Sequence, residues 1–458
     1  MLRKIRIAAA AFFFVLTTLL FLDFTGTLHA WFGWMAKIQF LPALLALNVG
    51  VVAFLVILTL LFGRVYCSVI CPLGVMQDIV SWASGKRRKH RNRFAYSPAL
   101  TWLRRGMLVV FVAAMLAGVG SLLAPYSAYG RIASNLLAPV YAWGNNLLAY
   151  IAGRMDSYAF YSVDVWMKSL STLLVAVVTF AVLFVLAWRS GRTYCNTICP
   201  VGTVLGFLAR YSLFKPRFDT SKCNGCKLCA RNGKASCIDP AAHKIDYSRC
   251  VACMDCLENC RQGAITYTLR RRKPDPAPAP QRPAADAAKT PSDASRRRFL
   301  GLAGIVAYSA LRAQEKKVDG GLAVIVDKKI PNRATPVVPP GAQSLRHFNA
   351  HCTGCQLCVS VCPNQVLRPS GKLMTLMQPE MSFERGYCRP ECTKCAEVCP
   401  TGAIRLTDLA GKSSIQIGHA VWIAENCVVN TDGVSCNNCA RHCPAGAIKM
   451  VRRDPDDP

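Results

Sequence analysis

Acidic residues are scarce in this chain. Its 458 residues include 25 Asp and Glu against 55 Lys and Arg, which gives a formal net charge of +30. A charge of this sign suits nucleic acid or a membrane surface. The chain is also 52% hydrophobic, with its apolar residues mainly in the first 210 positions and its cysteines mainly after position 220. This segregation favours a membrane protein and predicts no nucleic-acid partner.

Other absences narrow the function further. The sequence has no Cys-x-x-Cys-His motif, which excludes a c-type haem. It also has no DNA-binding or signalling module, which argues against a regulator that senses redox state. The remaining classes are electron carriers and redox assembly factors.

Charge is almost missing from four long apolar stretches, of which the first contains only Arg6. Each approaches the ~20 residues that cross ~30 Å of hydrocarbon. The sequence therefore predicts an α-helical bundle of four membrane spans. The stretches are 5–22, 40–62, 106–124 and 170–188.

Cations beside these stretches predict their orientation, because Lys and Arg concentrate on the cytoplasmic side. They precede the first stretch, follow the fourth, and gather between the second and third. The N-terminus and the segment after the fourth span are therefore expected in the cytoplasm of a bacterium, with the chain multi-pass in the inner membrane. Segment 131–152 is interpreted as an interfacial helix on the outer face, with a further span as the alternative. The cations between the second and third stretches are Arg64, Lys86, Arg87, Arg88, Lys89, Arg91, Arg93, Arg104 and Arg105.

The membrane half repeats one motif. Gly-Arg-x-Tyr-Cys-x3-Cys-Pro-x-Gly occurs at 63–74 and again at 191–202. Two such thiol pairs could meet across a pseudo-twofold axis and form a metal centre or redox-active dithiols. A purely structural turn is the alternative. The four cysteines of this membrane redox motif are Cys67, Cys71, Cys195 and Cys199.

All other cysteines fall into five groups of four with ferredoxin-like spacing. Three thiolates two residues apart wrap one cubane, and the fourth ligates the other cluster of a two-cluster unit. Zinc ribbons use paired Cys-x2-Cys instead. Five groups predict about five 4Fe–4S clusters. The groups are Cys223, Cys226, Cys229 and Cys237; Cys250, Cys253, Cys256 and Cys260; Cys352, Cys355, Cys358 and Cys362; Cys388, Cys392, Cys395 and Cys399; and Cys427, Cys436, Cys439 and Cys443.

The fourth cysteine of each group sets the pairing of the clusters. In the first two groups, Cys260 is expected to complete the first cluster and Cys237 the second. The last three groups cannot pair evenly. One scheme exchanges Cys399 with Cys443 and leaves the third group self-contained.

Composition divides the rest of the chain. A four-span membrane domain (1–210) leads into a cytoplasmic two-cluster ferredoxin domain (211–270) and a Pro/Ala-rich linker (271–294). Segment 295–313 begins Ser-Arg-Arg-Arg-Phe-Leu and fits a twin-arginine signal, expected to remain as a fifth, anchoring span. A three-cluster ferredoxin-like domain (314–458) would then be extracytoplasmic. The two ferredoxin domains are expected to have the α+β bacterial-ferredoxin fold.

The repeated Cys-Pro motifs and the cysteine groups resemble a known family. Residues 1–270 resemble the NapH-type membrane ferredoxin of quinol-dehydrogenase modules, and residues 295–458 resemble its exported NapG-type partner, although that type usually has four cysteine groups. The related NosR type carries a flavin-attachment motif and an outer domain, and neither is found here.

The resemblance implies an electron-transfer subunit and not a stand-alone enzyme. Its expected partners are membrane quinol, the lipid bilayer, and an extracytoplasmic reductase or cytochrome. The alternative is a redox maturation factor of the copper-oxidase assembly type. Those relatives end in an immunoglobulin-like domain, whereas this chain ends in a ferredoxin.

Overall fold

The structure is a computed structural model that describes residues 1–86, 94–117, 122–269, 335–372, 375–384, 386–418, 421–443 and 446–451. The chain divides into two compact units, Met1–Ile415 and Gln416–Pro458. The first contains a helical bundle, a first ferredoxin module (214–269) and a second ferredoxin module (335–415). The expected linker and twin-arginine segment lie outside the described residues.

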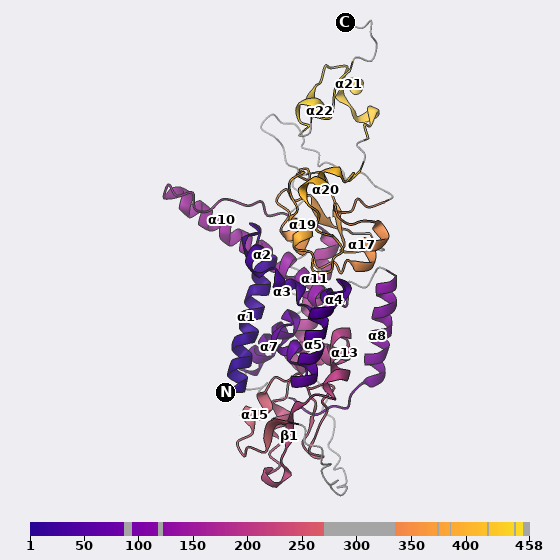
Figure 1. Cartoon of the computed structure of the whole chain (residues 1–458). Coiled ribbons are helices and arrows are strands. Elements are labelled where there is room, and N and C mark those ends of the chain that lie inside the picture. The colour runs from indigo at the N-terminus through magenta and orange to yellow at the C-terminus, as the bar shows by residue number, and fades with distance from the viewer. Residues whose placement is uncertain are drawn as a thin grey trace, which may run out of the picture. The chain divides into compact units, whose positions relative to one another are not determined.

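Apolar sequence in the first half forms helices of very different lengths (Figure 1). The bundle helices are α1 (Leu2–Leu22), α2 (Thr27–Phe32), α3 (Trp34–Lys37), α4 (Phe40–Leu45), α5 (Val49–Phe62), α6 (Val65–Val69), α7 (Pro72–Gly85), α8 (Thr101–Leu116), α9 (Pro125–Ile132), the π-helix η2 (Ala133–Leu137), α10 (Ala138–Arg154), α11 (Leu170–Ser190), α12 (Thr193–Thr197) and α13 (Pro200–Ala209).

Two of the described helices, α1 and α11, are long and apolar enough to cross a membrane. They coincide with the first and fourth predicted spans. The other two predicted spans are not confirmed. The second is broken, because Leu47 has a left-handed φ of 53° and Asn48 caps a new helix by accepting from Val51 N at 3.2 Å. Helix α5 is left with 14 residues, about 21 Å at 1.5 Å per residue. The third corresponds to α8, which has 16 residues.

The sequence repeat is also a structural repeat. In each copy a long apolar helix is followed by a one-turn helix and then by a helix that begins with proline, namely α5, α6 and α7 in the first and α11, α12 and α13 in the second. Proline suits the first turn because its missing N–H needs no partner there. Segment 131–152 is helical as predicted, and α10 has no buried residue.

The first module continues directly from α13. Its strand β1 (Phe214–Phe218) pairs antiparallel with β4 (Ile265–Leu269), so that the two ends of the module meet. A second small sheet joins β2 (Ile238–Asp239) to β3 (Lys244–Ile245). The module also contains the 3-10 turn η3 (Thr220–Lys222), α14 (Leu228–Arg231) and α15 (Asp255–Asn259).

The second module has the same kind of short elements. Its strands β5 (Leu367–Pro369) and β6 (Pro379–Met381) pair antiparallel. Its helices are α17 (Leu345–His351), α18 (Leu357–Ser360), α19 (Lys394–Glu397) and α20 (Leu409–Ser414). The second unit contains η7 (Ala424–Asn426), α21 (Val428–Thr431) and α22 (Asn438–Arg441).

Candidate metal centres

The two Cys-Pro motifs interlock through their arginines. Arg64 of the first copy donates to Cys195 O of the second at 3.1 Å, and Arg192 of the second donates to Cys67 O of the first at 2.7 Å. Both guanidinium groups are fully buried. The expected pseudo-twofold meeting of the two copies is therefore present, and the arginines hold it together.

The last glycine of each motif makes this crossing possible. A Cβ added to Gly74 would lie 2.2 Å from Cys67 O and 2.7 Å from Arg192 Nη1. A Cβ on Gly202 would lie 2.3 Å from Cys195 O and 2.8 Å from Arg64 Nη2. Each glycine thus leaves room for the arginine of the other copy.

All four motif thiols are buried beside this crossing. Burial, followed by the charges of Cys67 and Cys195, raises the pKa of the Cys71 thiol to about 12. Burial also raises the pKa of Cys199. Free thiols in such surroundings stay protonated and react slowly. The geometry suits a centre whose own charge displaces the protons, or a disulfide, better than an exposed reactive thiolate.

A buried carboxylate joins the motif to the first module. Asp78 accepts from Arg192 Nε at 2.9 Å and Nη2 at 2.8 Å, and it pairs with Arg6 at 2.9 Å and Lys234 at 3.7 Å. Burial alone would raise the pKa of Asp78, but Arg192 and Lys234 outweigh it and hold that pKa well below its usual range. The Asp78 carboxylate is therefore the point at which the first module joins helices α1 and α7 and the corner between α11 and α12.

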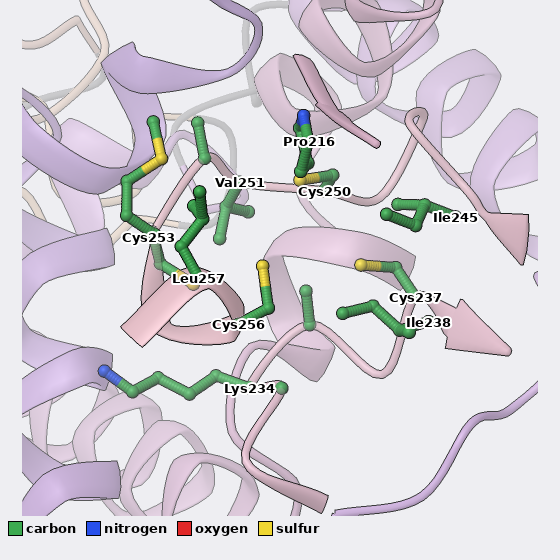
Figure 2. A pocket seen from close by; sticks show the side chains of 14 residues that line it. Pro216, Lys234, Cys237, Ile238, Ile245, Cys250, Val251, Cys253, Cys256 and Leu257 are labelled. Carbon is green, nitrogen blue, oxygen red and sulfur yellow. The ribbon is translucent and has the colours of Figure 1, made fainter. Parts of the chain in front are cut away.

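The first module gathers its cysteines into two sets. One cavity is lined by Cys223, Cys226, Cys229 and Cys260, and another by Cys237, Cys250, Cys253 and Cys256. Figure 2 shows the sulfurs of Cys237, Cys250 and Cys256 facing a common space. These are the two ligand sets expected from the sequence, including the distant Cys237.

The loops around these cysteines have a common backbone form. In the Cys-x2-Cys-x2-Cys loops, the residues on either side of the middle cysteine have left-handed φ angles. They are Gly225 and Lys227, Ala252 and Met254, and Gly354 and Gln356. Such loops turn successive N–H groups inward and favour an anion. A cubane with four thiolates is an anion, so these residues fit a 4Fe–4S cluster.

In the second module the structure brings cysteines of the third and fourth groups together. Burial, followed by the charges of Cys355, Cys352 and Cys399, raises the pKa of Cys358. A separate cavity is lined by Cys362, Cys388, Cys392 and Cys395. The pairing of the last three groups stays a prediction, and this arrangement favours an exchange of Cys362 and Cys399 between the third and fourth groups.

No three His, Cys, Asp or Glu in the described ranges are close enough to hold a single metal ion. In a cubane, each thiolate binds a different iron at a different corner. In the fifth group, Ala447 N donates to Cys443 Sγ at 3.3 Å, a contact that stabilises a thiolate.

Sequence reasoning gave no role to several residues of these sites. The Gly-Arg dipeptide at the start of both motif copies was a signal for Arg64 and Arg192. Asp78 had no comparable signal, since nothing in a single carboxylate shows which cations surround it. The same is true of Asp23, whose carboxylate forms a buried pair with His29 at 3.1 Å after the end of α1.

Comparison with known proteins agrees with this geometry. Residues 44–90 and 172–221 match a family described as a 4Fe-4S binding domain, so both repeat copies are included. Residues 351–403 match a 4Fe-4S dicluster domain, which covers the third and fourth cysteine groups. No solved structure matches the chain.

Three relatives indicate the class of protein. The ferredoxin-type protein NapH of Escherichia coli is 28% identical over 50% of this chain and 70% of its own length. The methylamine utilization ferredoxin-type protein MauM of Methylophilus methylotrophus is 33% identical over 24% of this chain and 50% of its own. The regulatory protein NosR of Stutzerimonas stutzeri is 24% identical over 48% of this chain, which spans only 27% of that relative. The chain therefore carries 4Fe–4S ferredoxin domains and is homologous to electron-transfer proteins of this class. Its apolar helices and these relatives indicate a membrane protein.

Proposed function

We propose that this chain is an electron-transfer protein of the bacterial cytoplasmic membrane that passes electrons from membrane quinol, through 4Fe–4S clusters, to an extracytoplasmic reductase or cytochrome. It would combine a NapH-type membrane ferredoxin with a NapG-type exported one in a single polypeptide. The observation that carries the proposal is that both candidate spans have the first ferredoxin module at one end and the second at the other.

Helix α1 has these contacts at its two ends. Before its first turn is complete, Arg3 donates to Asp255 of the first module at 2.8 Å. Just beyond its last residue, Thr25 O accepts from Lys394 of the second module at 3.0 Å. Its 21 residues span about 31 Å, the thickness of a hydrocarbon core.

Helix α11 runs the opposite way between the same modules. Ahead of it, Lys168 donates to Val359 O of the second module at 3.3 Å. After it, Arg192 N donates to Lys234 O of the first module at 2.9 Å. The contacts at both ends of α1 and α11 support the prediction of four membrane spans, in which the shorter helices α5 and α8 would be the other two. They also support an extracytoplasmic second module, for which segment 295–313 would supply the twin-arginine export signal.

The clusters would supply one-electron transfer, and the cysteines would be their ligands. We assign one cubane to each of five sets: Cys223, Cys226, Cys229 and Cys260; Cys237, Cys250, Cys253 and Cys256; Cys352, Cys355, Cys358 and Cys399; Cys362, Cys388, Cys392 and Cys395; and Cys427, Cys436, Cys439 and Cys443. The interlocked motif of Cys67, Cys71, Cys195 and Cys199 would form one further redox site at the cytoplasmic boundary.

Reduction of the purified chain by a quinol analogue, followed by electron paramagnetic resonance, tests this function. Signals from reduced cubanes are expected, with about twenty irons per chain at four per cubane. Cys67→Ser and Cys195→Ser should each stop the transfer of electrons from quinol to the first module while dithionite still reduces the soluble clusters. Normal reduction in both variants would leave the motif with a structural role alone, and about eight irons would contradict clusters in the second module.

A further inference from the structure

The end of α1 carries a buried pair of ionisable side chains that no cluster explains. His29 Nδ1 lies 3.1 Å from Asp23 Oδ2, and the two side chains are 6% and 3% exposed. A carboxylate only accepts hydrogen bonds, so Nδ1 must carry the proton and donate it. The basic nitrogen of the neutral ring is therefore Nε2.

That nitrogen is buried and has no hydrogen-bond partner among the residues that the structure describes. A buried polar atom without a partner costs free energy, and such atoms need an explanation. Folding of the loop does not supply one. Asp23 accepts from Gly26 N at 2.8 Å and Leu28 N at 2.9 Å, and Thr25 Oγ1 accepts from Thr27 N at 3.3 Å, so the start of α2 is capped without the His29 ring. His29 adds nothing to that cap except a ring held in one tautomer.

The surroundings indicate the chemical class of a ligand. The pair follows the last residue of an apolar helix that can cross a membrane, at the depth where the head of a lipid-soluble molecule would lie. Phe24, between the two helices, packs near Tyr161 and Tyr141 with ring centroids 5.7 and 6.3 Å apart. Both tyrosines are exposed, at 60% and 45%. Flat aromatic surfaces beside a fixed proton acceptor suit a flat molecule with ring hydroxyls.

The same loop contacts a candidate cluster site. Lys394 lines the cavity of Cys362, Cys388, Cys392 and Cys395, and its Nζ donates to Thr25 O at 3.0 Å. Thr25 in turn donates to Asp23 Oδ1 at 2.7 Å. Only one side chain and one short turn separate the histidine–aspartate pair from four cysteines suited to an electron acceptor.

We propose that His29 and Asp23 form the quinol-oxidation site, with His29 as the catalytic base and Asp23 as its positioning residue. This rests on the proposed function. The O–H bond of the quinol breaks and an N–H bond forms on Nε2. Each of the two protons leaves with one electron, and the electron acceptor is a one-electron iron–sulfur centre. His29 releases the first proton to water before it takes the second, and quinone is the product.

The test uses the full, cluster-loaded chain with duroquinol as reductant and a hydroxyquinoline N-oxide as a non-reducing quinol analogue. In His29→Gln the amide keeps a polar group at Nε2 but cannot take a proton. Its clusters should be reduced by duroquinol about 100-fold more slowly, in line with loss of a general base. Binding of the analogue, followed by fluorescence quenching, should be little changed. His243→Gln, a histidine of the first module, is the matched control and should behave as wild type.

Asp23→Asn separates positioning from folding. The amide oxygen can still accept from Gly26 N, but an amide that donates to Nδ1 selects the wrong tautomer and leaves Nε2 protonated. The same amide nitrogen no longer accepts from Leu28 N. Quinol reduction should fall, with dithionite-reduced spectra intact. Wild-type rates in His29→Gln would overturn the site, and so would loss of the dithionite-reduced signals in both variants, since that marks a structural role. If duroquinol fails to reduce even the wild type while dithionite succeeds, quinol is not the donor and the proposed function falls with the site.

Discussion

The two ferredoxin modules are attached to the helical bundle by different kinds of contact. The first module is held by buried charge: Asp78 with Lys234, Arg3 with Asp255, and Arg64, which donates to Ser248 O at 3.2 Å. The second module is held by hydrogen bonds to backbone and amide oxygens, including those that Lys168 and Lys394 donate. Asn135 donates to Gln356 Oε1 at 2.9 Å, and Cys355 O packs directly against Gly130.

The difference follows from where each module begins in the chain. The first continues from α13, and its strand β1 is joined to the bundle where Leu213 N donates to Leu60 O at 2.8 Å. It is built into the repeat, because the arginines that join the Cys-Pro motifs also reach the module. The second is connected through residues 270–334 and meets only the far ends of helices. The first module is thus attached through ion pairs, whereas the second docks through hydrogen bonds that a separate protein could also make.

The largest expected difference between the modules is their accessibility. Protease added to intact spheroplasts should digest the chain after about residue 335 and spare residues 223–260. Replacing Arg296 and Arg297 with Lys should then protect the second module as well. Protection of both modules in the unmutated chain would place them on the same side and remove the basis of the comparison.

Removal of the central carboxylate should release the first module but not the second. Asp78→Asn leaves Arg6 and Arg192 buried without their counter-charge, which costs about 3–5 kcal/mol. Limited proteolysis and thermal unfolding should show earlier loss of residues 214–269. Because the pKa of Asp78 is lowered in the folded state, its contribution is complete at neutral pH and is lost only as pH falls below the ordinary value of 3.8. An unchanged proteolysis pattern would show that β1 and β4 hold the module alone.

Replacing one glycine of the motif with alanine should destabilise the contact between the two motif copies by a smaller free energy. In Gly74→Ala the new methyl group meets Cys67 O and Arg192, and overpacking of this kind costs about 1–3 kcal/mol. Gly85→Ala, in the same helix and with nothing within 4 Å of its Cβ, is the matched control. It should be neutral or stabilising by up to about 1 kcal/mol. Equal melting temperatures for the two variants would contradict the close approach of Arg192.

The smallest effect is expected at the second interface. Asn135→Ala removes one hydrogen bond to Gln356, worth about 1 kcal/mol. Slightly faster proteolysis of the second module is expected, with no change in the first. A large loss in the first module would show that the two interfaces are coupled through η2.

The spacing of residues along the chain predicted those features of the sites that local backbone geometry determines. The Cys-x2-Cys-x2-Cys loops, the ligand role expected of Cys237, and the meeting of the two Cys-Pro motifs could all be inferred from the order of residues. The proposed exchange of Cys362 with Cys399 could not, because three consecutive groups that each end in Cys-x3-Cys leave the choice of partner to tertiary packing. The break at Leu47 was missed for a similar reason. An apolar run shows that a segment avoids water, but it does not show where the backbone turns within it.

The pairing of Arg3 with Asp255 also has a consequence for the order of assembly. These two residues are 252 positions apart. A ribosome that adds about 5–20 residues per second needs roughly 13 to 50 s between them. During that time Arg3 lacks Asp255, and Asp78 lacks Lys234. The contacts that fix the start of α1 therefore form only after the module made later has folded.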